Sequence, residues 1–316
     1  MKREHFADRL FAAVARKQSQ VVVGIDPRLA KIMPALAQQG ERGGVRRTEG
    51  ATAMLLRFSL SVINAVRDAA VAIKPQVAFF EQFGHDGMRV YGEVIQAAQQ
   101  RGLIVIGDVK RGDIGSTAEA YAMAHLPGPP GDAAQTLPDF HADAITVNPL
   151  FGSDGMKPFL ERASVSGCGV FALVKTSNPS SAEIQDLNCG GRPLYEHVAG
   201  LVKEWGAPHV GRCGYSLLGA VAGATFPAQL QTLRGLMPHT PFLVPGFGAQ
   251  GAGVEDVLPA FDGEGLGAVV NSSRAILYAW EEGPYASKYG AANWQDAVRA
   301  AAEDMRKAIW DATHKG

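Results

Sequence analysis

Four charged residues of alternating sign follow two short apolar segments of the sequence. Lys74 follows the first of these segments, and Asp108 and Lys110 follow the second, with Asp113 three residues further on. Because Asp108 and Lys110 are two residues apart, their side chains point to the same side of an extended backbone. A structural ion pair is the simple alternative, since buried charges must pair. Four charges of both signs at strand ends favour a catalytic array.

A second group of residues has the composition of a phosphate site. The segment PGFGAQG, at 245–251, and the segment NSSR, at 271–274, each follow an apolar run. Glycines such as Gly246 and Gly248 let backbone N–H groups approach an anion, and Arg274 can donate two charge-assisted hydrogen bonds. An ordinary tight turn is the alternative for the glycines taken alone.

A third segment is suited to hydrogen bonding with a polar ring. It is Lys175-Thr176-Ser177-Asn178-Pro179, directly after another apolar run. Its hydroxyls and amide could recognise a heterocycle. The alternative is a turn rich in Ser and Asn.

The elements that must hold these residues are buried strands, because the apolar runs are short and continuous. Helix-like stretches lie between many of them, such as 52–67 and 88–101, and this alternation predicts a parallel sheet. Eight such units predict an α/β protein with a (β/α)8 TIM barrel, whose catalytic groups lie at the carboxyl ends of the strands. An open doubly wound sheet is the alternative. The expected strands lie at 21–25, 70–73, 103–106, 144–147, 170–174, around 209–211, 242–244 and 268–270.

The length of 316 residues and the hydrophobic content of 47% are sufficient for one such barrel. We expect a single domain over residues 1–316, with loop insertions near 38–50 and 125–137. The first insertion is polar and rich in Gly and Arg, and the second contains the run LPGPPG. A helix is expected over 294–315.

Composition excludes several classes of function. A formal net charge of −1 gives no electrostatic case for nucleic acid or an anionic membrane, and no apolar run approaches the ~18 residues that span a bilayer. The charged start of the sequence lacks the apolar stretch of a signal peptide. Three cysteines without metal-type spacing indicate reduced thiols and a cytoplasmic protein. The histidines have no metal or triad spacing, and no Walker or dinucleotide motif is present.

The segment DVKRGDIGST, at 108–117, resembles the signature of the orotidine 5′-phosphate decarboxylase family, in its longer bacterial subgroup (type 2). The similarity extends over 21–278. It includes the segments GIDP at 24–27, IKPQ at 73–76, VNP at 147–149, KTSNP at 175–179, PGFGAQG at 245–251 and NSSR at 271–274.

The resemblance implies a decarboxylase that converts orotidine 5′-phosphate to UMP, the last step of de novo pyrimidine nucleotide synthesis, without a metal or organic cofactor. Lys74, Asp108, Lys110 and Asp113 would form the family's charge array. Lys110 would donate a proton to C6 of the pyrimidine, and Asp108 would face the departing carboxylate.

It also implies substrate contacts and a homodimer. Asp113 would enter the active site of the partner subunit, together with Ile114 and Thr117. The remaining contacts would be Asp26 and Lys74 with the ribose hydroxyls, Ser177 with the pyrimidine, and Gln250 and Arg274 with the phosphate, beside Gly246 and Gly248.

Two other functions remain open. A Mg²⁺-dependent sugar-phosphate lyase or aldolase of the same barrel superfamily would hold its metal with an acidic residue at the position of Lys74. A non-catalytic nucleotide-binding barrel would keep Arg274 and the glycines but could lose Asp108 or Lys110.

Overall fold

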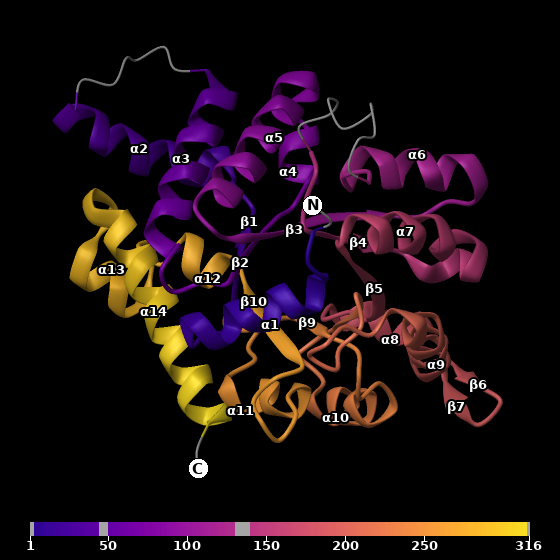
Figure 1. Ribbon diagram of the computed structural model, residues 1–316. Coiled ribbons are helices and arrows are strands. Elements are labelled where there is room, and N and C mark those ends of the chain that lie inside the picture. Colours follow the sequence, from indigo (N-terminus) through magenta and orange to yellow (C-terminus); the bar gives the residue numbers. More distant parts are fainter. Residues whose placement is uncertain (1–2, 44–49, 130–139, 315–316) are drawn as a thin grey trace.

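The computed structural model of the protein describes residues 3–43, 50–129 and 140–314. Eight parallel strands close into a barrel in the spatial order β1-β10-β9-β8-β5-β4-β3-β2, and helices surround it (Figure 1). This confirms the (β/α)8 barrel and excludes the open sheet. The barrel strands are β1 (Val21–Ile25), β2 (Ala72–Pro75), β3 (Ile104–Arg111), β4 (Ala144–Val147), β5 (Gly169–Lys175), β8 (Leu218–Ala222), β9 (Phe242–Pro245) and β10 (Ala268–Ser272).

The connections between strands carry long helices, short helices and one small hairpin. The long helices of the described residues are α1 (Phe6–Lys17), α2 (Leu29–Gly43), α3 (Ala51–Val66), α5 (Gly84–Gln100), α6 (Gly115–His125), α7 (Gly152–Ser166), α9 (Leu194–Gly206), α10 (Pro227–Leu236) and α14 (Trp294–Thr313). The shorter elements are α4 (Ala78–Glu81), α8 (Ala182–Gln185), α11 (Val254–Val257), α12 (Arg274–Leu277), α13 (Gly283–Tyr289) and the hairpin β6 (Asn188–Cys189) with β7 (Arg192–Pro193). None of the described helices is long and apolar enough to cross a membrane.

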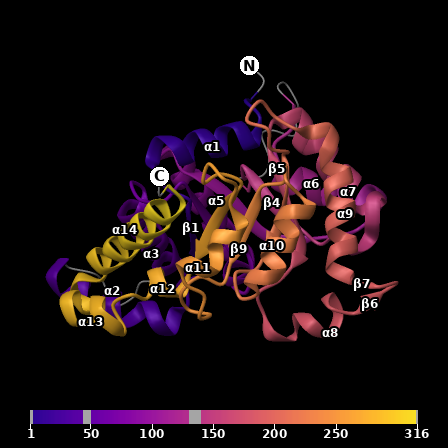
Figure 2. The ribbon, with the colours of Figure 1, turned by 90° about the horizontal axis from the view of Figure 1, so that it is seen from below.

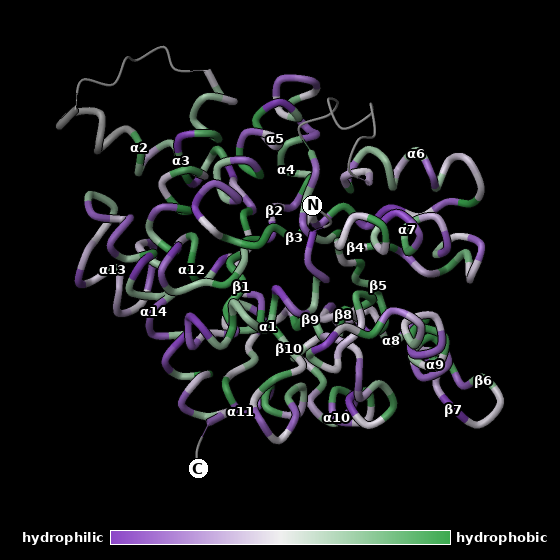
Figure 3. Tube along the Cα trace, in the orientation of Figure 1, coloured by the Kyte–Doolittle hydropathy of each residue, from purple (hydrophilic) through white to green (hydrophobic). Residues whose placement is uncertain are grey.

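The strands form because their side chains are apolar on both faces. Every residue of β1, β8 and β10 is buried, since one face packs inside the barrel and the other against the helices. Figure 3 shows hydrophobic residues concentrated on the central strands and hydrophilic residues on the outside of the helices. Continuous apolar runs therefore predicted most strands, often to within two residues.

The sixth barrel strand was predicted in the wrong place. We expected it around 209–211, but the strand is β8, at Leu218–Ala222. Val210 instead forms an isolated antiparallel bridge with Ser216, across a turn that contains Gly214. β8 contains a glycine at position 219, where a Cβ would lie 2.4 Å from the Phe171 ring. Its weak apolar pattern thus reflects close packing against β5.

The insertions differ in part from the expectation. The expected loop at 38–50 is helical up to Gly43, where α2 ends, and residues 44–49 lie outside the described residues. In the second segment, α6 ends at His125, 126–129 have no regular structure, and 130–137 again lie outside. The carboxyl-terminal helix is α14 and ends at Thr313.

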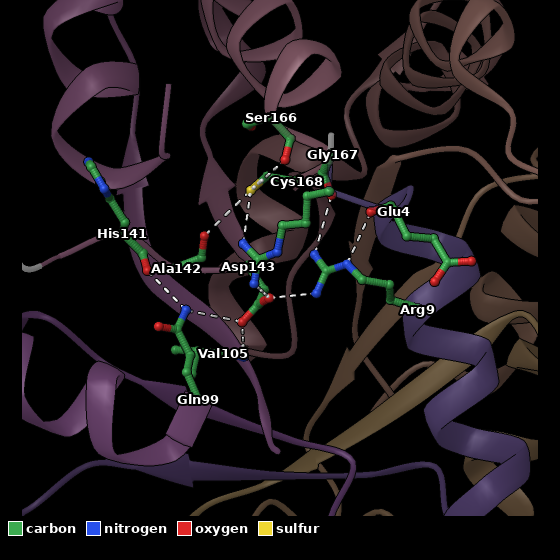
Figure 4. A network of polar contacts seen from close by, with 11 residues as sticks. Glu4, Arg9, Gln99, Val105, His141, Ala142, Asp143, Ser166, Gly167 and Cys168 are labelled. Atoms are coloured by element: carbon green, nitrogen blue, oxygen red, sulfur yellow. Dashed lines mark hydrogen bonds and ion pairs between the residues drawn. The ribbon is translucent and has the colours of Figure 1, made fainter. Parts of the chain in front are cut away.

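A charged network fastens α1 to the amino-terminal ends of the strands (Figure 4). The carboxylate of Asp143, directly before β4, is almost fully buried and pairs with the guanidinium groups of Arg3 and Arg9, the latter at 2.7 Å. Its other oxygen accepts hydrogen bonds from Gln99 Nε2 at 3.3 Å and from the N–H of Val105 at 2.9 Å. Figure 2 shows α1 at one end of the barrel and α8 and α12 at the opposite end.

Candidate active site

The buried carboxylate of Asp108 is the centre of the charge array at the carboxyl ends of the strands. Lys74 Nζ lies 2.6 Å from its Oδ2, and Lys110 Nζ lies 2.5 Å from its Oδ1. Gln76 Nε2 donates to Oδ2 at 3.0 Å, and the Thr146 hydroxyl donates to Oδ1 at 3.0 Å. Four donors from β2, β3, β4 and the β2–α4 turn therefore fix both carboxylate oxygens.

The charges of the array keep Asp108 and Lys74 ionised although both side chains are buried. Burial alone would raise the pKa of Asp108, but the ammonium groups of Lys74 and Lys110 hold it well below its usual range. Burial would likewise lower the pKa of Lys74, yet the negative charges of Asp108 and then Asp26 raise it above the usual value. The site thus holds a buried carboxylate between two cations.

Lys110 has an unusual backbone conformation. Its φ is 44°, in the left-handed region that residues with a Cβ rarely adopt. The pairing register between β3 and β4 shifts between Gly107 and Arg111, the stretch that contains this lysine. Irregular strand ends of this kind re-aim side chains near active sites. Here the Lys110 side chain, 46% exposed, reaches both Asp108 and the cavity.

Arg274 and the glycine-rich turn after β9 line the first lobe of this cavity. Gly246 and Gly248 have φ values of 110° and 77°, which favour glycine. A Cβ on Gly248 would lie 2.9 Å from Ala275 Cβ, so the turn also packs closely against α12. The Arg274 guanidinium is exposed at the first residue of α12 and donates to the carbonyl of Ala249 at 3.3 Å.

Two buried acceptors in the same lobe have no hydrogen-bond donor among the described residues. They are Asp26 Oδ1 and Asn271 Oδ1. The Tyr278 hydroxyl holds the backbone of Asp26 by donating to its carbonyl oxygen at 2.9 Å. A ligand that offers hydroxyl groups here would satisfy both acceptors.

Thr176, Ser177 and Asn178 line the second lobe, which also contains Asp108 and Lys110. Lys175 does not reach this lobe, because its ammonium is buried and pairs with Asp186 Oδ1 at 2.7 Å. Lys74 and Pro245 border both lobes, so the two form one elongated cavity. The two lobes have cavity volumes of about 180 and 230 Å³, and together they have the size of a small-molecule site.

Four predicted site residues do not line this cavity: Gly248, in the glycine-rich turn, and Asp113, Ile114 and Thr117. Asp113 precedes α6 and its carboxylate accepts a hydrogen bond from the N–H of Ile114 at 2.8 Å. Ile114 is 53% exposed, and Thr117 is exposed on the first turn of α6. The structure therefore does not bring Asp113, Ile114 and Thr117 together with Lys110 of the same chain.

Sequence reasoning missed several polar residues of the cavity. Thr146 lies within an apolar strand, and Gln76 was noted only as part of a motif. Asn271 was quoted in a motif without a role. Among the described residues, no group of three or more His, Cys, Asp or Glu side chains has an arrangement that could hold a metal ion.

Comparisons with known proteins agree with this arrangement. A family model described as "Orotidine 5'-phosphate decarboxylase / HUMPS family" matches residues 19–289, a range that includes every residue of the cavity. The orotidine 5′-phosphate decarboxylase of Rhodopirellula baltica is 45% identical over 304 residues, 96% of this chain and 98% of that protein. That of Caldicellulosiruptor bescii is 39% identical and covers 88% of this chain and 90% of its own. The solved structure of Leishmania donovani OMP decarboxylase has a TM-score of 0.72 at 31% identity and covers 99% of both chains.

Proposed function

The chain belongs to the orotidine 5′-phosphate decarboxylase / HUMPS family, and we propose that it converts orotidine 5′-phosphate to UMP. The observation that carries this proposal is the Lys74–Asp108–Lys110 array beside a lobe suited to a phosphate. This reaction, which produces UMP, would be the last step of de novo pyrimidine nucleotide synthesis. On this proposal, the carboxylate leaves and the proton arrives beside the two ammonium groups and the one carboxylate of this array.

The substrate fits the cavity in one direction. Its phosphate would bind Arg274, Gln250 and the turn at Gly246 and Gly248, where guanidinium and backbone N–H groups favour a dianion. The ribose hydroxyls would donate to the unpaired oxygen of Asp26, near the ammonium of Lys74. The pyrimidine would then occupy the second lobe, with its edge at Ser177.

The chemistry needs only side chains. The bond between C6 and the carboxylate breaks, CO2 leaves, and the electron pair stays on C6 in the plane of the ring. The Lys110 ammonium stabilises that charge and donates its proton to C6, after which solvent restores the proton on the amine. Asp108 repels the substrate carboxylate until CO2 departs.

The two alternatives fit the site less well. Asp108 Oδ2 lies 2.6 Å from the ammonium nitrogen of Lys74. A divalent cation bound to this carboxylate would therefore be repelled by the positive charge of Lys74. A silent nucleotide-binding barrel would have no need of the strained Lys110, whose conformation is costly. Both arguments favour the decarboxylase.

We further propose a homodimer in which Asp113, Ile114 and Thr117 complete the active site of the partner subunit. The support is the exposed apolar surface beside them: Leu150 is 81% exposed and Phe151 is 49% exposed. A Cβ on Gly112 would lie 3.6 Å from the Phe151 ring, so this surface adjoins the Asp113 segment. Exposed apolar side chains that adjoin one another, as these two do, are a feature of interaction surfaces.

We also propose that the chain acts as one barrel domain in the cytoplasm. The barrel strands extend from Val21 to Ser272, and α14 packs against α3 and β1. The three cysteines, Cys168, Cys189 and Cys213, are free thiols, as in a reducing compartment.

The test is to mix the purified protein with orotidine 5′-phosphate and follow the pyrimidine absorbance, with and without EDTA. We expect decarboxylation at the same rate in both samples and none with Lys110→Ala. Activity that EDTA abolishes and Mg²⁺ restores would favour the lyase. Binding of UMP without turnover by the wild-type protein would favour the silent barrel.

A further inference from the structure

Arg111, the last residue of β3, directly follows Lys110, and the proposed chemistry does not use its side chain. It does not line either lobe of the cavity, yet its side chain is only 25% exposed. The guanidinium contacts α4, α6 and its own strand. Nη2 pairs with Glu81 Oε1 at 2.5 Å, Nη1 donates to the carbonyl of Val109 at 3.4 Å, and the group lies 5.5 Å from the centre of the Tyr121 ring.

The carbonyl of Val109 belongs to the peptide bond that precedes Lys110. The other polar group of this peptide bond is the N–H of Lys110, which donates to the Thr146 hydroxyl at 2.9 Å. Arg111 and Thr146 therefore hold the same peptide plane from its two sides. The φ of Lys110, 44°, is the rotation of this residue relative to that plane. A fixed plane thus maintains the left-handed conformation, which directs the ammonium to the cavity.

Glu81, the last residue of α4, belongs to a segment that is itself attached to Asp108. The N–H of Glu81 donates to the carbonyl of Val77 at 2.9 Å, and the N–H of Val77 donates to the carbonyl of Asp108 at 3.3 Å. Gln76, one residue earlier, donates to the Asp108 carboxylate at 3.0 Å. The ion pair between Glu81 and Arg111 therefore closes a ring of contacts that runs from Asp108 through α4 to the end of β3.

Two other roles for Arg111 fit these contacts less well. A contact with the substrate would require the guanidinium to line the cavity, which it does not. A direct effect of its charge on the reaction would be weakened by the carboxylate of Glu81 beside it. The planar guanidinium can hold Glu81 and the Val109 carbonyl at the same time, in fixed directions. The contacts therefore favour a role in geometry.

From these contacts, and resting on the proposed function, we propose that Arg111 is a positioning residue for proton transfer by Lys110 and that Glu81 sets the direction of its guanidinium. Arg111 acts on the backbone of Lys110 and not on the substrate. The proton donor must lie within hydrogen-bonding distance of C6, and a displacement of about 1 Å can cost about a hundredfold in rate. Loss of the guanidinium should therefore slow the chemical step and leave substrate binding unchanged.

Arg111→Met removes the hydrogen bonds and keeps much of the length of the side chain. We expect kcat for orotidine 5′-phosphate to fall by roughly tenfold to a hundredfold, with KM unchanged. The rate is expressed per UMP-binding site, counted by isothermal titration of the full chain, so that unfolded protein does not imitate a slow chemical step. A wild-type kcat per site, or an effect on KM alone, would overturn the inference.

Arg111→Lys separates the hydrogen bond to the backbone from the charge. The ammonium can still pair with Glu81 but lacks the planar fork that also reaches the Val109 carbonyl. We expect kcat to stay about tenfold below that of the wild type, and a fully restored kcat would assign the effect to charge and contradict the inference. The matched control is Arg89→Met, which removes a more exposed arginine paired with Glu93 on α5 and should leave kcat unchanged.

Glu81→Gln gives a second measurement, on a side chain that is 40% exposed, so the change does not disturb the core. If Glu81 acts through Arg111, this change should lower kcat by about threefold or more in the wild-type background. It should change kcat little in the Arg111→Met protein, where the guanidinium is already absent. Losses that multiply in the double variant would overturn the role of Glu81.

The same assays separate this inference from the proposed function. A wild-type protein that neither decarboxylates orotidine 5′-phosphate nor binds UMP overturns both. A wild-type protein that does both, with Arg111→Met and Glu81→Gln proteins at the wild-type kcat, overturns only the role of Arg111 and Glu81.

Discussion

The hydroxyl of Thr146 accepts a hydrogen bond from the backbone N–H of Lys110 at 2.9 Å. The same hydroxyl donates to Asp108, 3.0 Å away. Since Lys110 has a φ of 44°, its backbone needs support from its surroundings to keep this conformation. One threonine on β4 therefore holds both the proposed proton donor and its carboxylate partner.

Thr146→Val should lower kcat for orotidine 5′-phosphate decarboxylation by roughly tenfold to a hundredfold, because Lys110 and Asp108 each lose a hydrogen bond. KM should change little, since the phosphate lobe is unaffected. Steady-state kinetics would measure both, with Thr146→Ser, which keeps the hydroxyl, as the matched control. A kcat that equals the wild-type value would remove Thr146 as a positioning residue.

Arg274→Ala should raise KM for orotidine 5′-phosphate by roughly tenfold to a hundredfold, because a charge-assisted contact with the phosphate is lost. Orotidine, which lacks the phosphate, should be affected little. The two substrates are compared by kcat/KM, with Arg299→Ala on the outer helix α14 as a control, where the arginine pairs with Asp296 at 2.8 Å. Equal losses for both substrates would mean that Arg274 has a structural role.

Lys110→Ala and Asp113→Ala proteins should each be nearly inactive yet complement each other when mixed. If Asp113 completes the site of the partner subunit, one site of a mixed dimer carries both changes and the other carries neither. Random reassortment makes about half of the dimers mixed, so activity should return to roughly a quarter of the wild-type level. Mass spectrometry would monitor the subunit exchange. Complete exchange without activity would show that Asp113 acts within its own subunit.

His125 should make the protein less stable in mild acid. Burial, aided by the positive charge of Arg111, lowers the pKa of His125 to about 4. The folded state thus favours the neutral imidazole ring. The contribution of this preference to the free energy of unfolding is complete above the unfolded pKa of about 6.5, and it is lost as the pH falls towards 4. The full effect is about 3 kcal/mol in the free energy of unfolding.

Urea unfolding between about pH 5 and 6.5 would measure this dependence. His125→Gln should flatten the pH profile, because the titrating ring is removed. His85→Gln is the control, since the side chain of His85 is 92% exposed. The same slope in the His125→Gln protein as in the wild type would contradict the assignment.

Asp143→Ala should destabilise the protein by about 3–5 kcal/mol, because two guanidinium groups would lose a buried carboxylate. KM for orotidine 5′-phosphate should stay unchanged, since Asp143 directly precedes β4 at its amino-terminal end, whereas the cavity lies at the carboxyl ends of the strands. Thermal unfolding and kinetics would measure the two effects, with the exposed Asp296→Ala as the control. A raised KM with an unchanged unfolding temperature would contradict this division.

Sequence reasoning predicted the barrel because apolar runs such as Val21–Ile25 are buried on both faces and need no distant information. Because the strands were predicted from these runs, the residues that follow them, Asp108, Lys110 and Arg274, were also predicted to lie near strand ends. β8 was missed in part because it is interrupted by Gly219, whose reason is the Phe171 ring, a residue distant in the sequence.

The partners of the site residues were harder to predict. Thr146 is an ordinary polar residue in the sequence, and its importance depends on contacts with a neighbouring strand. Asp143 gave no signal either, because Arg3 and Arg9 meet it only in the folded chain. Short motifs identify residues of unusual chemistry, whereas hydrogen-bonded neighbours require the three-dimensional arrangement.

The network around Asp143 has a practical consequence for attaching the protein to a solid support. Arg3 belongs to this network, so the start of the chain lies at the amino-terminal ends of the strands. Arg274 and the glycine turn open at the other end. A linker joined ahead of Arg3 would therefore orient immobilised molecules with the cavity facing away from the surface, which keeps the nucleotide's path from solution free.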